Sequence, residues 1–314
     1  MRRGRVIGSL APSSVATALL VLSVGAGASA RAQTLDDADF MKFRVLCAGV
    51  LYTREQWTDY WEGTLKRSNG NIGTLTTTSA TYMTAYGLTD RLNIVASLPY
   101  VSTRASQGVL EGQRGHQDVT VGLKYRAFNT PLTTSGMLHG VVSISGTLPT
   151  TDYTPDFYPL SIGSASTRAT GRGLLSFQGR NGVFVNGAMA YTRRGNVRLD
   201  RISYYTNDQL YLTNAVQMPD VTESALTIGY QGHGFFAPVS IVQQRTLGGG
   251  DIRRQDMPFV SNRMNFTRID GHVRYAVPRS RGVLLMLGAS QVLAGRNVGQ
   301  ATSVTAGLLL AGKL

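Results

Sequence analysis

The sequence predicts an all-β fold, a closed antiparallel transmembrane β-barrel of about twelve strands with short periplasmic turns and long extracellular loops. Three observations lead to this prediction. The chain starts with an export signal, about a dozen later stretches alternate apolar and polar residues, and the connections between them alternate in length. A soluble sandwich could show the alternation within strands, but it has no reason to alternate long and short connections. A barrel that inserts from the periplasm does alternate them, because its short turns stay on the periplasmic side and its long loops face the outside of the cell.

Residues 1–32 have the features of a secretory signal peptide. Three arginines among the first five residues form a basic start, the stretch 6–30 contains no charge, and small residues lead to a cleavage site after Ala30 or, as preferred here, after Ala32. A membrane anchor is the alternative, but the strongly apolar part is only about ten residues, short of the ~20 that cross a bilayer as a helix. No other uncharged run approaches that length, so helical membrane spans are not expected.

The rest of the chain is expected to form one barrel. Residues 33–45 are predicted to be a short periplasmic lead-in, and residues 46–314 the outer-membrane β-barrel. Cys47 is the only cysteine, which excludes an internal disulfide framework, and it is expected to be a packed strand residue. Export together with a barrel places the protein in the bacterial outer membrane.

The mature chain is basic. Four of the 31 lysines and arginines precede residue 33, whereas all 18 acidic residues follow it, which leaves a net charge of about +9. Nucleic acid is the usual partner of a basic chain, but here the positive residues are scattered with no run longer than two, so no nucleic acid is expected. Contact with outer-membrane lipid and anionic lipopolysaccharide, or a basic pore, accounts for the charge.

The clearest alternation lies in residues 117–128. Val121, Leu123 and Tyr125 share one face, and Lys124 lies on the other. A period of two predicts a strand with one apolar and one polar face. The same pattern predicts twelve strands in chain order at 46–58, 75–86, 92–101, 117–128, 137–148, 168–178, 183–193, 221–231, 235–246, 262–277, 282–293 and 301–314.

The predicted connections alternate in length. Long connections span 59–74, 102–116, 149–167, 194–220 and 247–261, short ones span 87–91, 129–136, 179–182, 232–234 and 278–281, and a moderate last loop spans 294–300. Backbone groups in lipid are satisfied only if such a sheet closes on itself. The last strand ends on Leu314, where outer-membrane barrels commonly carry an aromatic residue that the barrel assembly machinery reads. That machinery is an expected partner during biogenesis.

Two segments resemble a known family. YGLTDRLNIVASLPYV (86–101) and GHQDVTVGLKYR (115–126) are similar to the outer-membrane transporters grouped under the meta-pathway of phenol degradation. Members typically show a Tyr-Gly-Leu-Thr-Asp turn, an apolar strand ending Leu-Pro-Tyr, and a Gly-Asp-containing Lys-Tyr strand. Here His116 and Gln117 separate the Gly from the Asp, and the match covers about 40 of the 314 residues. The resemblance implies a barrel that admits hydrophobic or aromatic compounds, and it brings no catalytic residues.

If the apolar face of each strand meets lipid, the alternate face lines the lumen. The lumen-lining candidates are Asp118, Lys124, Arg126, Arg172, Glu223, Arg268, Asp270, His272 and Arg274. Basic side chains outnumber acidic ones in this set, and rings of Arg and Lys bias a pore toward anions. The alternative is that these charges pair across the barrel and fill it, since a twelve-stranded lumen is narrow enough for side chains to occupy.

Aromatic residues near strand ends are expected at the membrane interfaces. These are Tyr100, Tyr125, Tyr191, Tyr230 and Tyr275. A second group, Trp57, Tyr60 and Trp61, fits either the interface or a core cluster beside a loop.

The sequence does not favour an enzyme. Nucleophilic catalysis on a barrel would need a Ser and a His together on the lipid face near the outer rim, but the parity of His139 and Ser143 turns both inward. The four histidines have no ligand spacing with one another, so neither a metal site nor a cofactor is expected.

Three functions follow, in order of preference. The first is passive uptake of small hydrophobic or aromatic solutes through a porin-like channel with a basic-biased lumen. The second is a filled barrel with a structural or surface-interaction role, in which Tyr204, Tyr205 and Tyr211 of the longest loop would be contacts. The third is a barrel enzyme. The sequence does not identify the solute.

Overall fold

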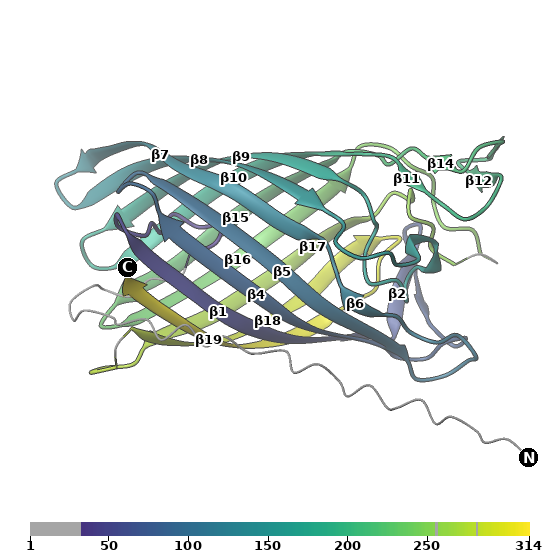
Figure 1. Cartoon of the computed structure of the whole chain (residues 1–314), viewed down its shortest axis with the longest axis horizontal. Helices are drawn as coiled ribbons and strands as arrows, with labels where there is room; N and C mark the ends of the chain where they lie inside the picture. The colour runs from purple at the N-terminus through teal and green to yellow at the C-terminus, as the bar shows by residue number, and fades with distance from the viewer. Residues whose placement is uncertain (1–32, 255–256, 281) are drawn as a thin grey trace, which may run out of the picture.

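A computed structural model describes residues 33–254, 257–280 and 282–314. Twelve strands of the described chain close into an antiparallel barrel (Figure 1). They are β1 (Val45–Trp57), β4 (Leu75–Gly87), β5 (Leu92–Ala105), β7 (Val119–Thr133), β8 (Gly136–Leu148), β9 (Arg168–Gly179), β10 (Val183–Arg194), β15 (Val221–Gly232), β16 (Phe235–Thr246), β17 (Asn265–Ala276), β18 (Val283–Arg296) and β19 (Thr302–Lys313). The predicted fold class is confirmed, while the predicted signal peptide lies outside the described residues.

The first and last strands close the barrel. β1 pairs antiparallel with β19 from Val45 opposite Lys313 to Gln56 opposite Thr302, and its other edge pairs with β4. Each barrel strand therefore has a neighbour on both sides. Closure satisfies the backbone groups that an open sheet would leave unpaired in lipid.

The two ends of the barrel differ (Figure 1). Short turns join β4 to β5, β7 to β8, β9 to β10, β15 to β16 and β17 to β18, and the carboxyl terminus lies at the same end. Long connections gather at the other end. This is the arrangement that the alternating connection lengths predict, with the short turns at the periplasmic end.

The hairpin of β7 and β8 is longer than the sequence predicts. The residues expected to form a turn at 129–136 mostly continue β7, which runs through Pro131 to Thr133. The pairing with β8 shifts register on both sides of this proline, and such bulges accommodate a residue that cannot donate to the ladder. In Figure 1 this hairpin projects past the short-turn end of the wall.

The long connections have structure of their own. They hold β2 (Asp59–Glu62), β3 (Leu65–Ser68), β6 (Arg114–His116), a 3-10 helix η1 (Pro155–Phe157), β11 (Val197–Arg198), β12 (Tyr204–Thr206), β13 (Gln209–Tyr211) and β14 (Ala215–Val216). Tyr204 is buried in a small core beneath these loops and stacks on Tyr211 with ring centroids 5.1 Å apart. Of the three tyrosines considered as contacts, only Tyr205 is exposed, and the Arg253 guanidinium lies over its ring, 3.8 Å from the centroid.

The wall is apolar outside. Val121, Leu123, Ile269, Val273 and Leu308 are among the many large apolar side chains exposed on its outer face. Their strand neighbours turn inward, as period-two alternation requires. No helix in the described ranges is both long and apolar enough to span a membrane.

Residues 33–41 lie inside the barrel, whereas 42–44 are exposed beside the short turn between β4 and β5. The sequence treats this stretch as a lead-in ahead of the wall, but in the structure the side chains and backbone of 33–41 contact lumen-facing residues of several strands. It is called the inner segment below. The strands present basic side chains to the lumen, and the carboxylates of the inner segment neutralise them.

Candidate functional site

The inner segment is tied to the wall by Lys124. Its ammonium donates to Asp37 Oδ1 at 2.7 Å and to the backbone oxygens of Thr34 at 2.7 Å and Asp39 at 3.0 Å. Lys124 has no exposed surface. The Lys124 ammonium is therefore a buried charge that has lost its hydration. The three acceptors that replace water all belong to the inner segment.

Two further ion pairs hold the segment at other points. Arg274 Nη2 donates to Asp39 Oδ2 at 2.6 Å, and Arg172 lies 3.0 Å from both Asp36 and Glu223. Together with Arg268, which is 2.7 Å from Asp270, these pairs give Lys124, Arg172, Arg268 and Arg274 each an acidic partner. The inner segment supplies three of those acids.

The other side of the inner segment is apolar. Met41 packs in a buried cluster with Val45, Cys47, Ala85, Val95, Leu284, Leu309 and Ala311. Its backbone is fixed on both sides, because Gln33 Oε1 accepts its N–H at 2.9 Å and Asn93 Nδ2 donates to its oxygen at 3.0 Å. Gly122 leaves room for Leu35, since a Cβ there would lie 2.9 Å from a Leu35 methyl carbon.

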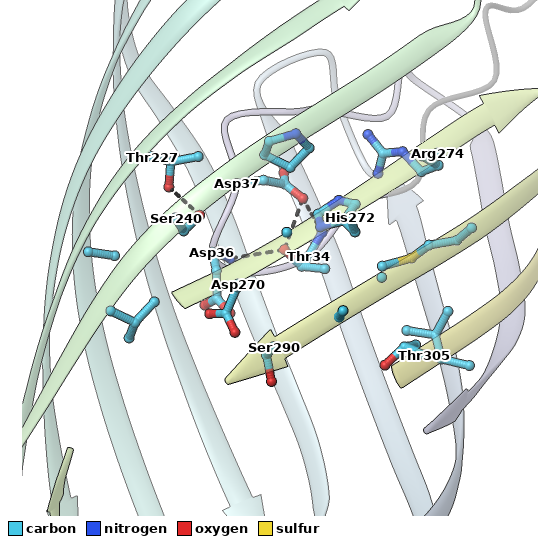
Figure 2. A pocket seen from close by; sticks show the side chains of 18 of the residues that line it. Thr34, Asp36, Asp37, Thr227, Ser240, Asp270, His272, Arg274, Ser290 and Thr305 are labelled. Atoms are coloured by element: carbon cyan, nitrogen blue, oxygen red, sulfur yellow. Dashed lines mark hydrogen bonds between the residues drawn. The ribbon is translucent and has the colours of Figure 1, made fainter. Parts of the chain in front are cut away.

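A cavity of about 470 Å³ lies in the lumen beside the segment. Figure 2 shows Asp36 and Asp37 of the segment together with Asp270, His272 and Arg274 of β17 among its lining residues. Hydroxyl groups line part of its wall in hydrogen-bonded pairs, such as Thr227 with Ser240 at 2.8 Å and Ser290 with Ser303 at 2.7 Å. Apolar side chains, including Leu51, Met83, Phe236 and Met286, line the rest.

A second cavity of about 160 Å³ lies closer to the short-turn end. Arg126, His139 and Asp39 are among its lining residues, and Gln178 and Gln231, joined at 3.0 Å near the ends of their strands, mark its periplasmic side. His139 and Ser143 both face the interior, where Ser143 Oγ donates to Leu35 O at 3.4 Å. Among the residues that the structure describes, no group of His, Cys, Asp or Glu is placed to hold a metal ion.

The nine lumen-lining candidates are distributed over four places. Arg172, Glu223, Arg268, Asp270, His272 and Arg274 line the larger cavity, and Arg126 lines the smaller one. Lys124 is enclosed by the inner segment. Asp118 lies away from both cavities, at the outer end of the wall.

Asp118 helps to hold the loop between β8 and β9. It accepts from Arg168 Nη2 at 2.9 Å and from the Tyr153 hydroxyl at 2.6 Å, while that hydroxyl accepts the N–H of Ala165 at 2.7 Å. Burial and the neighbouring carboxylate raise the pKa of Tyr153, so it stays a neutral donor. Asp118 therefore supports a loop and does not contact either cavity.

The five predicted interface tyrosines lie near the two ends of the barrel. Tyr125, Tyr230 and Tyr275 are close to the short turns, and Tyr100 and Tyr191 are in the outer half. Tyr191 also donates to Asp220 at 2.5 Å. In contrast, Trp61 is buried with Val292 and Ala301 under the β2–β3 hairpin, and Trp57 packs against it, so the core-cluster interpretation holds for these tryptophans.

Sequence reasoning missed the three acids of the inner segment. It also missed three residues that line both cavities, Phe184, Asn186 and Phe236. Asp36, Asp37 and Asp39 stand directly after the predicted cleavage site, and their excess next to a basic lumen was a usable signal. No sequence signal marked Phe184 and Phe236 as neighbours, because their strands are far apart in the chain.

Searches against protein-family models and curated proteins gave no match. Solved structures do match. An outer membrane channel from Pseudomonas putida F1 superimposes with a TM-score of 0.67 at 14% identity, over 89% of this chain and 100% of that one. The translocator domain of autotransporter NalP from Neisseria meningitidis gives 0.45 at 10% identity (89% and 91% covered), and the CymD monoaromatic hydrocarbon channel gives 0.36 at 10% (87% and 89%). At the level of the fold, the resemblance to an outer-membrane transporter is confirmed.

Proposed function

We propose that this protein is an outer-membrane channel that admits small hydrophobic or aromatic solutes by passive diffusion through its lumen. The observation that carries the proposal is the cavity of about 470 Å³ inside a closed wall with an apolar exterior. Its lining combines apolar side chains with hydroxyl pairs, which suits a solute that has an apolar body and a few polar atoms.

The charges of the cavity argue for uncharged solutes. Asp36, Asp37, Glu55, Glu223 and Asp270 line it together with three guanidinium groups. The basic bias expected from the strands is therefore offset by the inner segment, and a small anion would find few unpaired cations. An uncharged ring gives up less hydration on entry than an ion does.

The experiment is reconstitution of the protein in planar bilayers and liposomes. We expect small discrete currents and uptake of neutral aromatic solutes above the rate of empty vesicles. The wall offers a matched pair of variants on β16, because Ser240 lines the cavity and the adjacent Ile241 is exposed outside. Ser240→Trp should reduce transport and Ile241→Trp should not. If neither current nor uptake exceeds that of empty membranes, the channel proposal is wrong.

A filled barrel with a surface-interaction role is the second candidate. It is favoured by the inner segment, which occupies one side of the lumen and joins the wall through several buried charges. The same reconstitution separates the two candidates, since a folded barrel that passes no solute would support this one.

A further inference from the structure

The two lumen cavities share three lining residues. Phe184 and Asn186 of β10 and Phe236 of β16 line both the larger and the smaller cavity. A solute moving from one cavity to the other along this side of the lumen must pass them. On the opposite side Met41 packs in an apolar cluster, one member of which, Leu309, also lines the larger cavity.

The two phenylalanine rings meet over a glycine. Their centroids are 5.2 Å apart and their planes are inclined by only 9°. Gly229 of β15 lies between the two strands, and a Cβ at this position would lie 2.5 Å from the Phe184 ring. The glycine therefore makes the close approach of the rings possible.

Asn186 adds a buried polar group without a partner. The residue is 6% exposed, and its Oδ1 accepts no hydrogen bond from any described residue. A buried amide oxygen that has lost water and gained no donor is unfavourable unless a ligand or water satisfies it. Because Asn186 lines both cavities, a solute that passes from one to the other comes into contact with its amide group.

The inner segment supports this arrangement. The Arg274 guanidinium lies over the Phe236 ring at 4.2 Å and is itself held by Asp39 at 2.6 Å. Phe236 is thus held between a cation on one side and the Phe184 ring on the other. The segment orders these side chains without lying between the two rings.

We propose that Phe184, Asn186 and Phe236 form the selectivity constriction of the lumen, where an uncharged ring solute bearing a hydroxyl group donates to Asn186 Oδ1 while its ring contacts the phenylalanines. The proposal rests on the proposed function. The constriction discriminates against ions because one amide and two aromatic rings do not replace a hydration shell. It discriminates against rings that lack a donor because the amide oxygen then stays unpaired.

Ionic current provides the readout. Hydroquinone added to the wild-type channel should interrupt the current, and 1,4-dimethoxybenzene, which lacks a donor, should do so more weakly. Asn186→Leu keeps the size of the side chain and removes the acceptor, so it should weaken the hydroquinone block by roughly tenfold, the equivalent of one hydrogen bond. The dimethoxybenzene block should change little.

Two further variants test the location. Asn186→Asp places a charge in the constriction and should shift the reversal potential toward cations. Ser240→Asp, at the larger cavity only, should shift it much less. Phe184→Ala should raise conductance severalfold. Heat-modified mobility on gels verifies that each variant forms a barrel.

The outcomes separate the two proposals. A wild-type protein that carries neither current nor solute overturns both. A conducting wild type whose Asn186 variants keep the same hydroquinone block, or whose two aspartate variants shift the potential equally, overturns the constriction and leaves the channel intact.

Discussion

The two sides of the inner segment are built differently. Toward β1, β4, β18 and β19 it presents Met41 to a dry apolar cluster. Toward β9, β10, β15, β16 and β17 it packs Phe40 with Leu174 and Ala188, presents Asp36 and Asp39 to guanidinium groups, and borders both cavities. The first side is thus purely apolar around Met41, although Leu51 and Met83 of the same strands also line the larger cavity, whereas the second side combines apolar contacts with ion pairs.

This difference indicates separate tasks for the two sides. Close packing around Met41 anchors the segment on that side. Charged side chains need fixed partners, and the space beside them is where we propose that a solute fits.

The largest effect is expected from the charged side. In the double variant Asp37→Asn and Asp39→Asn, Lys124 and Arg274 lose their carboxylates while still enclosed, and breaking a buried pair in this way costs about 3–5 kcal/mol. Docking of the inner segment in the lumen therefore becomes unfavourable. Because release of the segment would widen the lumen, we expect conductance in planar bilayers to rise severalfold. Asp59→Asn is the control, because its pair with Lys66 is exposed and contributes little. Unchanged conductance in the double variant would mean that the apolar side alone holds the segment.

A smaller effect is expected from the apolar side. Met41→Ala removes a buried side chain and should lower the stability of the docked segment by about 2–5 kcal/mol. Cys47, the only cysteine of the chain, lies in the same cluster and reports on it. We expect a water-soluble maleimide to leave wild-type Cys47 unlabelled and to label it in the Met41 variant. Rapid labelling of the wild type would contradict a dry seal.

The smallest effect is expected from pH. Burial raises the pKa of Asp37, but the charges of Lys124 and Arg274 outweigh it and bring the pKa below the usual 3.8. A carboxyl with a lowered pKa contributes stability above its ordinary pKa and loses it as the pH falls through the folded value. We expect constant conductance from about pH 7 to about pH 5 and a rise only below about pH 4. A rise already near neutral pH would show that another group controls docking.

The strands were largely predictable from the sequence. The stretch 235–246 coincides with β16, and outward residues such as Val121 and Ile269 were identified by parity alone. The prediction failed for residues 129–133, where a proline inside a bulged strand resembles a turn. The short strands of the outer loops were also missed, because two to four paired residues leave no periodic pattern.

The candidate site was only partly predictable. Alternation along the strands predicted that all nine candidates face inward, and six of them line the larger cavity. It did not separate Asp118, which faces a loop, from Asp270, which faces the cavity. Alternation also could not identify the residues that line both cavities, because the stacking of Phe184 on Phe236 depends on Gly229 in the strand between them.

By itself the sequence determined the wall: the number and direction of its strands, the face each turns to lipid, and the end at which each loop lies. These properties follow from a period of two and from connection lengths, which are local in the chain. Only the tertiary structure decided what fills the lumen. Lys124 meets an acid 87 residues away and Arg274 one 235 residues away. Contacts at such separations depend on closure of the barrel, and no local pattern encodes them.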